Sequence, residues 1–421
     1  MSLPRRLDDW IDGFVHYTNN TEPRETYRRW VGISTVAAAL QRKCWVRWGR
    51  LIFYPNLYIV LVGPPAAKKG TAMEPGREFL DELGITIAAD SGSWQKFITS
   101  LEETATIEQG ADGNAYHHSS ITIFSAELTV FLGYDNYDML SVLCDWFDCR
   151  PRFVYDTFRG GRQEVPNVWA NLIGATTPSQ LRASLPEEAF GSGFTSRVIH
   201  VYEEGMDEEV IKPDLSESQF KTKDGLSIDL ESIKTMYGEF ETTNRFEEVY
   251  RDWRRVDSPK RHFPTEPRLD SYVERRRVFI FKLAMVYSAS RSGEMIIDDI
   301  DLINAIQTLE EAEKKMPDVF RGVGSNPLAA AQNRMQNILR ERKSIRSGKL
   351  YEMFTNDLTI SQFRDVLGGL MVMGFCEQDI LDKSEEGALI RLKIKKEIGD
   401  GSTNSSIKSV PGGINPLPST E

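Results

Sequence analysis

The chain has 421 residues, of which 40% are hydrophobic and 27% are charged, and its formal net charge is -11. This length predicts two or three domains, and the composition is that of a globular protein with a large core. The acidic balance excludes a protein that binds nucleic acid through overall positive charge, although a local basic surface is compatible with it. The four cysteines lack metal-site spacing and the apolar runs are too short to cross a bilayer, so we expect a cytoplasmic protein without membrane contact.

The first hundred residues predict helices followed by strands. Apolar residues recur at helical spacing through residues 5–45, with a break at the sequence NNTEPRET. The stretch CWVRWGRLIFYPNLYIVLVG is rich in β-branched and aromatic residues, and its last part is a continuous apolar run. Such a run is typical of a strand that is buried on both faces of a parallel sheet. The sequence AMEPGREFLDEL then predicts a helix, so a loop connects a buried strand to a helix.

The loop between this strand and helix resembles a phosphate-binding loop with altered residues. The usual pattern is G-x-x-x-x-G-K-[ST], in which backbone N–H groups and a lysine bind phosphates. Here Lys68 replaces the second glycine, Lys69 occupies the lysine position, and Gly70 replaces the hydroxyl residue. Thr71, one position later, is the candidate Mg²⁺ ligand unless water serves instead. The residues expected to bind ATP are Gly63, Pro64, Pro65, Ala66, Ala67, Lys68, Lys69, Gly70 and Thr71.

Three later segments supply further candidate residues for ATP hydrolysis. A second buried strand, residues 119–127, ends in Glu127, which we expect to orient the attacking water. A third strand runs into Thr177, a candidate γ-phosphate sensor together with Thr176, although a plain strand-to-turn junction explains it equally well. Arg197 precedes a final strand and is a candidate to reach the nucleotide of a neighbouring subunit, with a surface or salt-bridging arginine as the alternative.

The segment RFVYDTFRGGRQEVPN, between the second and third of these strands, predicts a β-hairpin with a tight turn at Gly160-Gly161. Its tip carries Phe158, Arg159 and Arg162. Positive charge beside an aromatic ring suits contact with a single DNA strand, so we expect these residues to contact DNA. A surface hairpin with a basic tip is the alternative interpretation.

From residue 226 the pattern becomes helical, and we expect an α-helical lid over residues 226–325. The segment SIDLESIKTMYGEFETT is interpreted as helical throughout. Three arginines begin a later helix, and because they point in different directions around it, only one or two can face a nucleotide. Arg276 is the one assigned to the nucleotide.

Residues 326–398 predict three short helices followed by a two-stranded ribbon, the plan of a winged-helix domain. Residues 327–396 contain twelve Lys and Arg against nine Asp and Glu, a local charge of +3 that suits phosphate contact. Gln362 and Arg364 on the third helix are the candidate DNA contacts. That helix is apolar for a groove reader, so docking of a protein is the equal alternative. Residues 399–421 are polar and rich in Gly, Pro and Ser, and are predicted to be disordered.

Four blocks in this order, YPNLYIVLVGPPAAKKGTA, FSAELTVFLG, NLIGATTPSQL and GSGFTSRVIHVYEE, resemble a phage and prophage family of AAA+ ATPases of DNA replication. The resemblance covers roughly residues 10–325. It implies an α/β fold with a P-loop AAA+ core over residues 51–225, after an N-terminal helical region of residues 1–50. It also implies an ATP-driven ring, hexameric in that family, acting in a bacterial host cell, with Arg197 acting on the neighbouring subunit.

The position of the hairpin is similar to that in the MCM-like and superfamily-three-like helicases, where it enters the ring pore. The expected function is therefore an ATP-hydrolysing DNA helicase or translocase that uses ATP and Mg²⁺, binds single-stranded or forked DNA, and works with a primase or other replication proteins. One alternative is a helicase loader or initiator that uses ATP as a switch. Another is a pseudo-ATPase scaffold. It is supported by Lys68 and Gly70, which depart from the usual loop, and by Ser125, which lies near the end of the acidic strand where an aspartate is usual.

Overall fold

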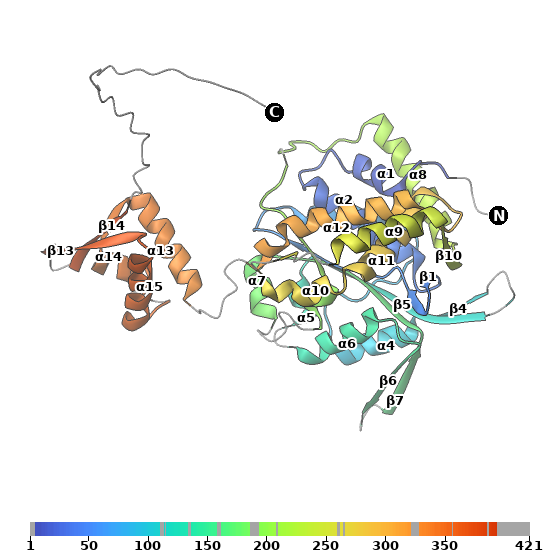
Figure 1. Cartoon of the computed structure of the whole chain (residues 1–421), viewed down its shortest axis with the longest axis horizontal. Helices are drawn as coiled ribbons and strands as arrows, with labels where there is room; N and C mark the ends of the chain where they lie inside the picture. The colour runs from blue at the N-terminus through green and yellow to red at the C-terminus, as the bar shows by residue number, and fades with distance from the viewer. Residues whose placement is uncertain are drawn as a thin grey trace, which may run out of the picture. The chain divides into compact units, whose positions relative to one another are not determined.

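The chain divides into two compact units, Met1–Val323 (unit 1) and Gly324–Glu421 (unit 2), each with its own hydrophobic core (Figure 1). The computed structural model describes residues 5–109, 113, 115–133, 136–157, 161–185, 193–207, 209–258, 262–263, 266–320, 328–355, 357–384 and 387–393. The predicted tail of residues 399–421 and the hairpin-tip residues Phe158 and Arg159 lie outside these described residues. The fold is mixed α/β, with parallel and antiparallel strands.

Unit 1 is built around a five-stranded sheet with the order β4-β5-β8-β3-β9. The strands are β3 (Tyr58–Val62), β4 (Ala105–Gln109), β5 (Ala115–Ser125), β8 (Val168–Thr176) and β9 (Ile199–Tyr202). All neighbours run parallel except β4, which is antiparallel to β5. Every residue of β3 and β8 is buried, which confirms the prediction that the apolar run before the loop is covered on both faces.

Helices cover both faces of this sheet. Helices α1 (Trp10–Tyr17), α2 (Glu25–Leu40), α11 (Arg276–Arg291) and α12 (Asp299–Val319) lie on one side, and α4 (Trp94–Glu103), α5 (Leu128–Leu132) and α6 (Tyr137–Phe147) lie on the other (Figure 1). The remaining helices of unit 1 are α3 (Lys69–Glu82), α7 (Pro178–Ser184), α8 (Glu217–Lys234), α9 (Asn244–Asp257) and α10 (Asp270–Val273). The predicted helices of residues 5–45 are confirmed, with Trp10, Phe14 and Trp30 in the core.

A second sheet joins distant parts of unit 1. Its order is β11-β10-β1-β2, and its strands are β1 (Cys44–Trp48), β2 (Leu51–Phe53), β10 (Gly238–Thr242) and β11 (Ile296–Ile297). The prediction of helix throughout SIDLESIKTMYGEFETT is wrong, because α8 ends at Lys234 and the residues after Gly238 form β10. Phe240 of β10 is buried, and β10 pairs in parallel with β1, so tertiary pairing outweighs the local helical pattern.

The predicted hairpin is confirmed in its strands, β6 (Arg152–Thr157) and β7 (Gly161–Pro166), which pair in antiparallel register. The sequence pattern did not predict the unit 1 elements α4, β4, α5, α7, α9 and β11.

The described residues of unit 2 form three helices and a three-stranded antiparallel sheet of order β12-β14-β13. Its elements are α13 (Ala329–Arg342), β12 (Ser344–Arg346), α14 (Ser347–Glu352), α15 (Ile360–Val372), β13 (Cys376–Ser384) and β14 (Gly387–Leu392). The expected helices and ribbon are present, and β12 adds a third strand that the pattern did not predict. Leu350, Phe363 and Ile390 belong to the core of unit 2.

Candidate functional site

The candidate phosphate-binding loop connects β3 to α3 at the carboxyl edge of the five-stranded sheet. It leaves β3 after Val62, and α3 begins at Lys69. Ala66 and Lys68 both adopt left-handed backbone conformations, with φ values of 68° and 56°. These two left-handed residues reverse the direction of the chain before the helix begins. The first-turn N–H groups of a helix have no acceptor within it, and the Lys68 side chain makes no capping hydrogen bond to them.

The Lys69 ammonium group folds back over this loop. Its Nζ donates to the carbonyl oxygens of Gly63, at 2.9 Å, and Pro64, at 3.0 Å. Within the described part of the chain, no carboxylate forms an ion pair with it. Burial lowers the pKa of Lys69, and the nearby charge of Glu127 opposes this shift. The result is a half-buried cation that neutral carbonyls hold in place at the N-terminus of a fourteen-residue helix.

Gly63 is the residue that the packing around the loop requires. A Cβ atom there would collide with the hydroxyl of Tyr27 and would lie 2.6 Å from the carbonyl oxygen of Glu203. The Tyr27 hydroxyl donates to the carbonyl of Val62 at 2.7 Å, and the Gly63 N–H donates to the carbonyl of Thr176 at 3.3 Å. The start of the loop is therefore enclosed by α2, β8 and β9.

The other loop residues have different surroundings. Gly70 and Thr71 are exposed, and the position of a Gly70 side chain is open, with no heavy atom within 4 Å. Pro65 and Ala66 are also exposed, whereas Ala67 is buried. Lys68 forms an ion pair with Glu22, with 2.5 Å between Nζ and Oε2. The altered residue at the usual glycine position therefore binds a carboxylate from the connection between α1 and α2.

The parallel register brings Glu127 and the two threonines to the same edge of the sheet. Glu127 follows β5, is exposed, and begins α5. Thr176 is buried and stands opposite Val62 in the β3–β8 register. Thr177 instead caps α7: its Oγ1 accepts the Gln180 N–H at 3.2 Å within a reciprocal capping box. Thr176 is thus the threonine directly beside the loop, and Thr177 has a structural role at the next helix.

Arg197 lies in an internal ion pair. Its guanidinium donates to Asp148 at 2.6 Å and 3.3 Å and to the carbonyl of Gly193 at 2.7 Å. Arg275 shares the same carboxylate, with 3.6 Å between its Nη1 and Asp148 Oδ1, and donates to Ser196 at 3.2 Å. Within one chain, Arg197 is therefore a salt-bridging arginine, as the alternative interpretation predicts. A role at a neighbouring subunit would require Arg197 to leave Asp148.

The assignment of Arg276 to the nucleotide is contradicted by its surroundings. Its side chain is 2% exposed and forms ion pairs with Glu313, at 2.7 Å, and with Asp257. The ring of Trp253 lies 5.8 Å from its guanidinium carbon. Arg276 joins α11 to α9 and α12 inside the helical part of unit 1, and buried carboxylates already neutralise its charge. Arg276 is therefore a structural residue. The sequence did not reveal this role, because the carboxylate partners of Arg276 lie on two other helices, α9 and α12.

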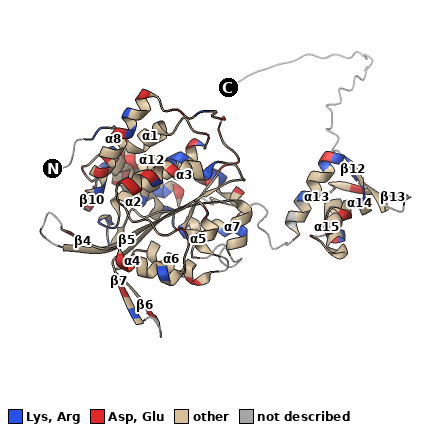
Figure 2. Ribbon diagram, turned by 180° about the vertical axis from the view of Figure 1, so that it is seen from behind, with Lys and Arg blue, Asp and Glu red and all other residues tan. Residues whose placement is uncertain are grey.

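The described stem of the hairpin carries balanced charge (Figure 2). Arg152 pairs with Glu164 at 2.5 Å, and the exposed Arg162 lies 3.9 Å from the same carboxylate. Gln163 donates to Glu102 of α4 at 2.9 Å, and Tyr155 packs against Trp94 of the same helix. The stem is thus anchored to α4. Among the predicted DNA contacts of the hairpin, Arg162 lies in the described residues, and its side chain is exposed.

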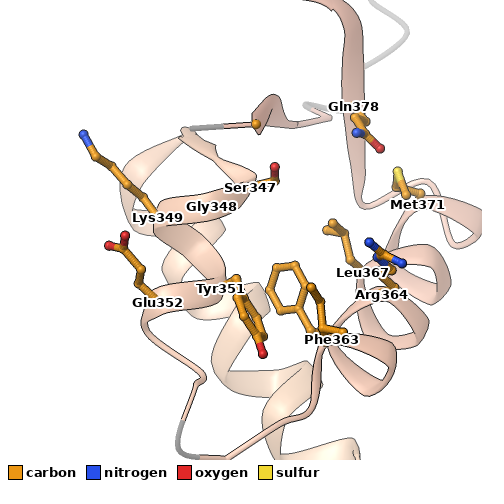
Figure 3. A pocket seen from close by; sticks show the side chains of 12 residues that line it. Ser347, Gly348, Lys349, Tyr351, Glu352, Phe363, Arg364, Leu367, Met371 and Gln378 are labelled. Atoms are coloured by element: carbon orange, nitrogen blue, oxygen red, sulfur yellow. The ribbon is translucent and has the colours of Figure 1, made fainter. Parts of the chain in front are cut away.

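In unit 2 the two predicted DNA contacts differ. Gln362 forms a capping box with Thr359 at the start of α15, so its amide oxygen accepts the Thr359 N–H at 2.9 Å. Arg364 is exposed and lines a cleft of about 710 Å³ between α14 and α15. Figure 3 shows Arg364 beside Leu367 and Met371, with Phe363 of the same helix next to Tyr351 of α14. The face of α15 therefore combines Arg364, which forms no ion pair with the described residues, with apolar side chains, whereas Gln362 caps the helix itself.

A second cleft, which the sequence did not indicate, opens beside the loop. It measures about 380 Å³ and is lined by Arg24, Tyr202, Glu203, Glu204, Lys315 and Asp318. Glu203 links the two places, because its carbonyl lies against Gly63 while its carboxylate pairs with Lys315 of α12 at 2.6 Å. The only sequence signal was the acidic pair that follows β9. Glu22, Tyr27 and Lys315 carried no signal, since they come from distant segments.

No family model matches this chain, and no curated protein matches it. In the part of the chain that the structure describes, no helix is both long and apolar enough to span a membrane. The described residues also contain no group of three or more His, Cys, Asp or Glu side chains that could hold a metal ion. The hydroxyl of Thr71, in the first turn of α3, and the carboxylate of Glu127, directly after β5, are oxygen groups of the kind that Mg²⁺ prefers.

Proposed function

We propose that unit 1 is a P-loop nucleoside triphosphatase of the AAA+ type, and that the protein couples ATP to work on DNA. The observation that carries this proposal is the Lys69 ammonium group, held over the carbonyls of Gly63 and Pro64 at the open N-terminus of α3. Backbone N–H groups and a cation without a carboxylate partner together suit a polyphosphate. The ATP triphosphate therefore fits the residues that are present.

The strand order supports the AAA+ type. Strand β8 lies between the loop strand β3 and the acidic strand β5, and β9 flanks β3 on its other side. This arrangement resembles that of AAA+ ATPases, in which the extra central strand carries the polar sensor residue. The order of elements in unit 2, in which α13, β12, α14 and α15 precede the β13–β14 ribbon, resembles that of winged-helix domains.

Each residue near the loop has a proposed role. Lys69 binds the phosphates. The cleft lined by Tyr202 and Lys315 is next to the loop, because Glu203 lines the cleft and also lies against Gly63. Glu127 accepts a hydrogen bond from the attacking water and orients it. Bound Mg²⁺ would neutralise charge on the phosphates, and Thr71 and Glu127 are the residues that would hold it. Thr176 replaces Thr177 as the proposed sensor, because Thr177 caps α7.

The coupling to DNA is supported by the hairpin between β6 and β7, which resembles the pore hairpin of ring helicases. We propose a ring-forming helicase or translocase of phage or mobile-element DNA replication, with Arg162 and the hairpin tip contacting the strand. Arg197 would serve a neighbouring subunit after leaving Asp148, and Arg275 would then remain as the partner of that carboxylate.

The direct test is ATP hydrolysis by the purified full-length chain, with and without single-stranded DNA. We expect DNA to stimulate turnover, and Lys69→Ala to weaken nucleotide binding at least about tenfold because a charged contact is lost. Glu127→Gln should keep nucleotide binding but lose turnover by roughly a hundredfold or more. Unchanged hydrolysis in both variants would contradict the assignment of this site.

A second candidate, an ATP-dependent switch or scaffold without efficient turnover, is favoured by Gly70, which lacks the usual hydroxyl. The position is open, so Gly70→Ser can be accommodated and adds the missing ligand oxygen. A wild-type protein that binds ATP without hydrolysing it, together with a Gly70→Ser variant that gains Mg²⁺-dependent turnover, would identify the switch. Equal turnover in both proteins would remove the reason for that candidate.

A further inference from the structure

Lys68 occupies a backbone position that favours glycine. Its φ and ψ are 56° and 29°, the left-handed region, and glycine is the usual residue at this point of a phosphate-binding loop. A residue with a side chain pays roughly 1 kcal/mol to adopt this conformation. A strained non-glycine residue in a binding loop suggests that its side chain has a use there.

Its partner is Glu22, in the connection between α1 and α2. The ion pair measures 2.5 Å, and the lysine and glutamate side chains are 36% and 18% exposed. The segment around Glu22 has anchors of its own, since the Glu22 carbonyl accepts the Asp207 N–H at 2.8 Å and Arg24 pairs with Asp207 at 2.9 Å. The backbone that carries Glu22 is thus held near the loop by contacts that do not depend on Lys68.

The two adjacent lysines therefore differ in what holds them. Lys69 is oriented by neutral carbonyls and keeps its charge available to an anion. Lys68 has its charge neutralised by a carboxylate. A lysine ammonium group sits on a flexible stem, and a polyphosphate carries several negative charges against the single charge of Glu22. A bound nucleotide can therefore compete with Glu22 for Lys68.

Resting on the proposed nucleotide site, we propose that Glu22 is a built-in competitor of the nucleotide. In the absence of nucleotide it neutralises Lys68 and ties the loop to the connection between α1 and α2. When a nucleotide binds, Lys68 exchanges Glu22 for a phosphate oxygen and becomes a second cationic phosphate ligand. The exchange lowers nucleotide affinity and signals the occupancy of the loop to the N-terminal helices.

The test is a double-mutant cycle on the full chain, with Glu22→Gln, Lys68→Met and the double variant. The measurement is the Kd of a non-hydrolysable ATP analogue by titration calorimetry. We expect Glu22→Gln to lower the Kd roughly two- to fivefold, the scale of a partly exposed ion pair. Lys68→Met should raise it by a similar factor. In the Lys68→Met background, Glu22→Gln should leave the Kd unchanged.

Each outcome is informative. If Glu22→Gln improves binding equally in both backgrounds, the carboxylate acts by simple repulsion and the exchange at Lys68 is wrong. If Glu22→Gln weakens binding or leaves it unchanged in the wild-type background, the pair is structural and the inference is overturned. If the wild-type chain does not bind the analogue at all, the proposed function itself fails. Thermal unfolding of each variant confirms that the comparison is made between folded proteins.

Discussion

Two runs of consecutive basic residues in unit 1, Lys68-Lys69 and Arg275-Arg276-Arg277, have opposite surroundings. In the loop, Lys69 is held by carbonyl oxygens, and no carboxylate of the described residues forms an ion pair with it. In the helix, Arg276 is buried between the carboxylates of Asp257 and Glu313. In the sequence, both are uninterrupted runs of basic residues. The comparison teaches that the partners a fold supplies decide whether a cation is available to a ligand or serves the structure.

The largest expected effect concerns Arg276. Arg276→Ala would remove the buried cation that lies between the carboxylates of Asp257 and Glu313, so we expect a loss of about 3–5 kcal/mol in the free energy of unfolding. Denaturant-induced unfolding of the full chain measures it. Arg277→Ala, one position later on the same helix and exposed, is the matched control and should change stability by no more than about 0.5 kcal/mol. Similar small losses in both variants would contradict the structural role of Arg276.

The next effect tests the packing that holds the loop. Gly63→Ala would press a methyl group against Tyr27 and the carbonyl of Glu203, so we expect a stability loss of about 1–3 kcal/mol, together with weaker nucleotide binding. Gly70→Ala, in the same loop but in open space and within α3, should instead stabilise the chain by about 0.5 kcal/mol. Equal stability in the two variants, measured by thermal unfolding, would show that the start of the loop is not enclosed.

The smallest effect is a pH dependence of nucleotide binding. Burial lowers the pKa of Lys69 below its ordinary value, and the negative charge of Glu127 raises it again. Because only the charged amine attracts phosphate, affinity should fall as the pH rises through the pKa of Lys69. Glu127→Gln removes the charge that favours the ammonium form, so the fall should begin at a lower pH. Calorimetric titrations over the alkaline range measure the affinity at each pH. An identical pH profile in the wild type and the variant would show that Glu127 does not affect the pKa of Lys69.

Much of the local structure could be predicted from the sequence. The apolar run of β3, the glycine-bounded loop and the helix after it are adjacent along the chain, so their order alone predicts a strand, a loop and a helix. The paired strands β6 and β7 likewise follow from a local alternation around a Gly-Gly turn. By contrast, the local pattern predicts a helix where the structure has β10. The strand forms through its pairing with β1, which joins residues almost two hundred positions apart, and no local pattern indicates that pairing.

The sequence by itself determined which residues the loop contains and that Lys69 would stand at the start of a helix, because strand, turn and helix preferences act over a few neighbouring residues. Only the tertiary structure decided which charges are free. It directed Lys68 to Glu22, Arg197 to Asp148 and Arg276 to Glu313, and it made Thr176 rather than Thr177 the neighbour of the loop. The reason is physical: an ion pair depends on distance in space, and burial, which sets its strength, comes from segments far apart in the chain.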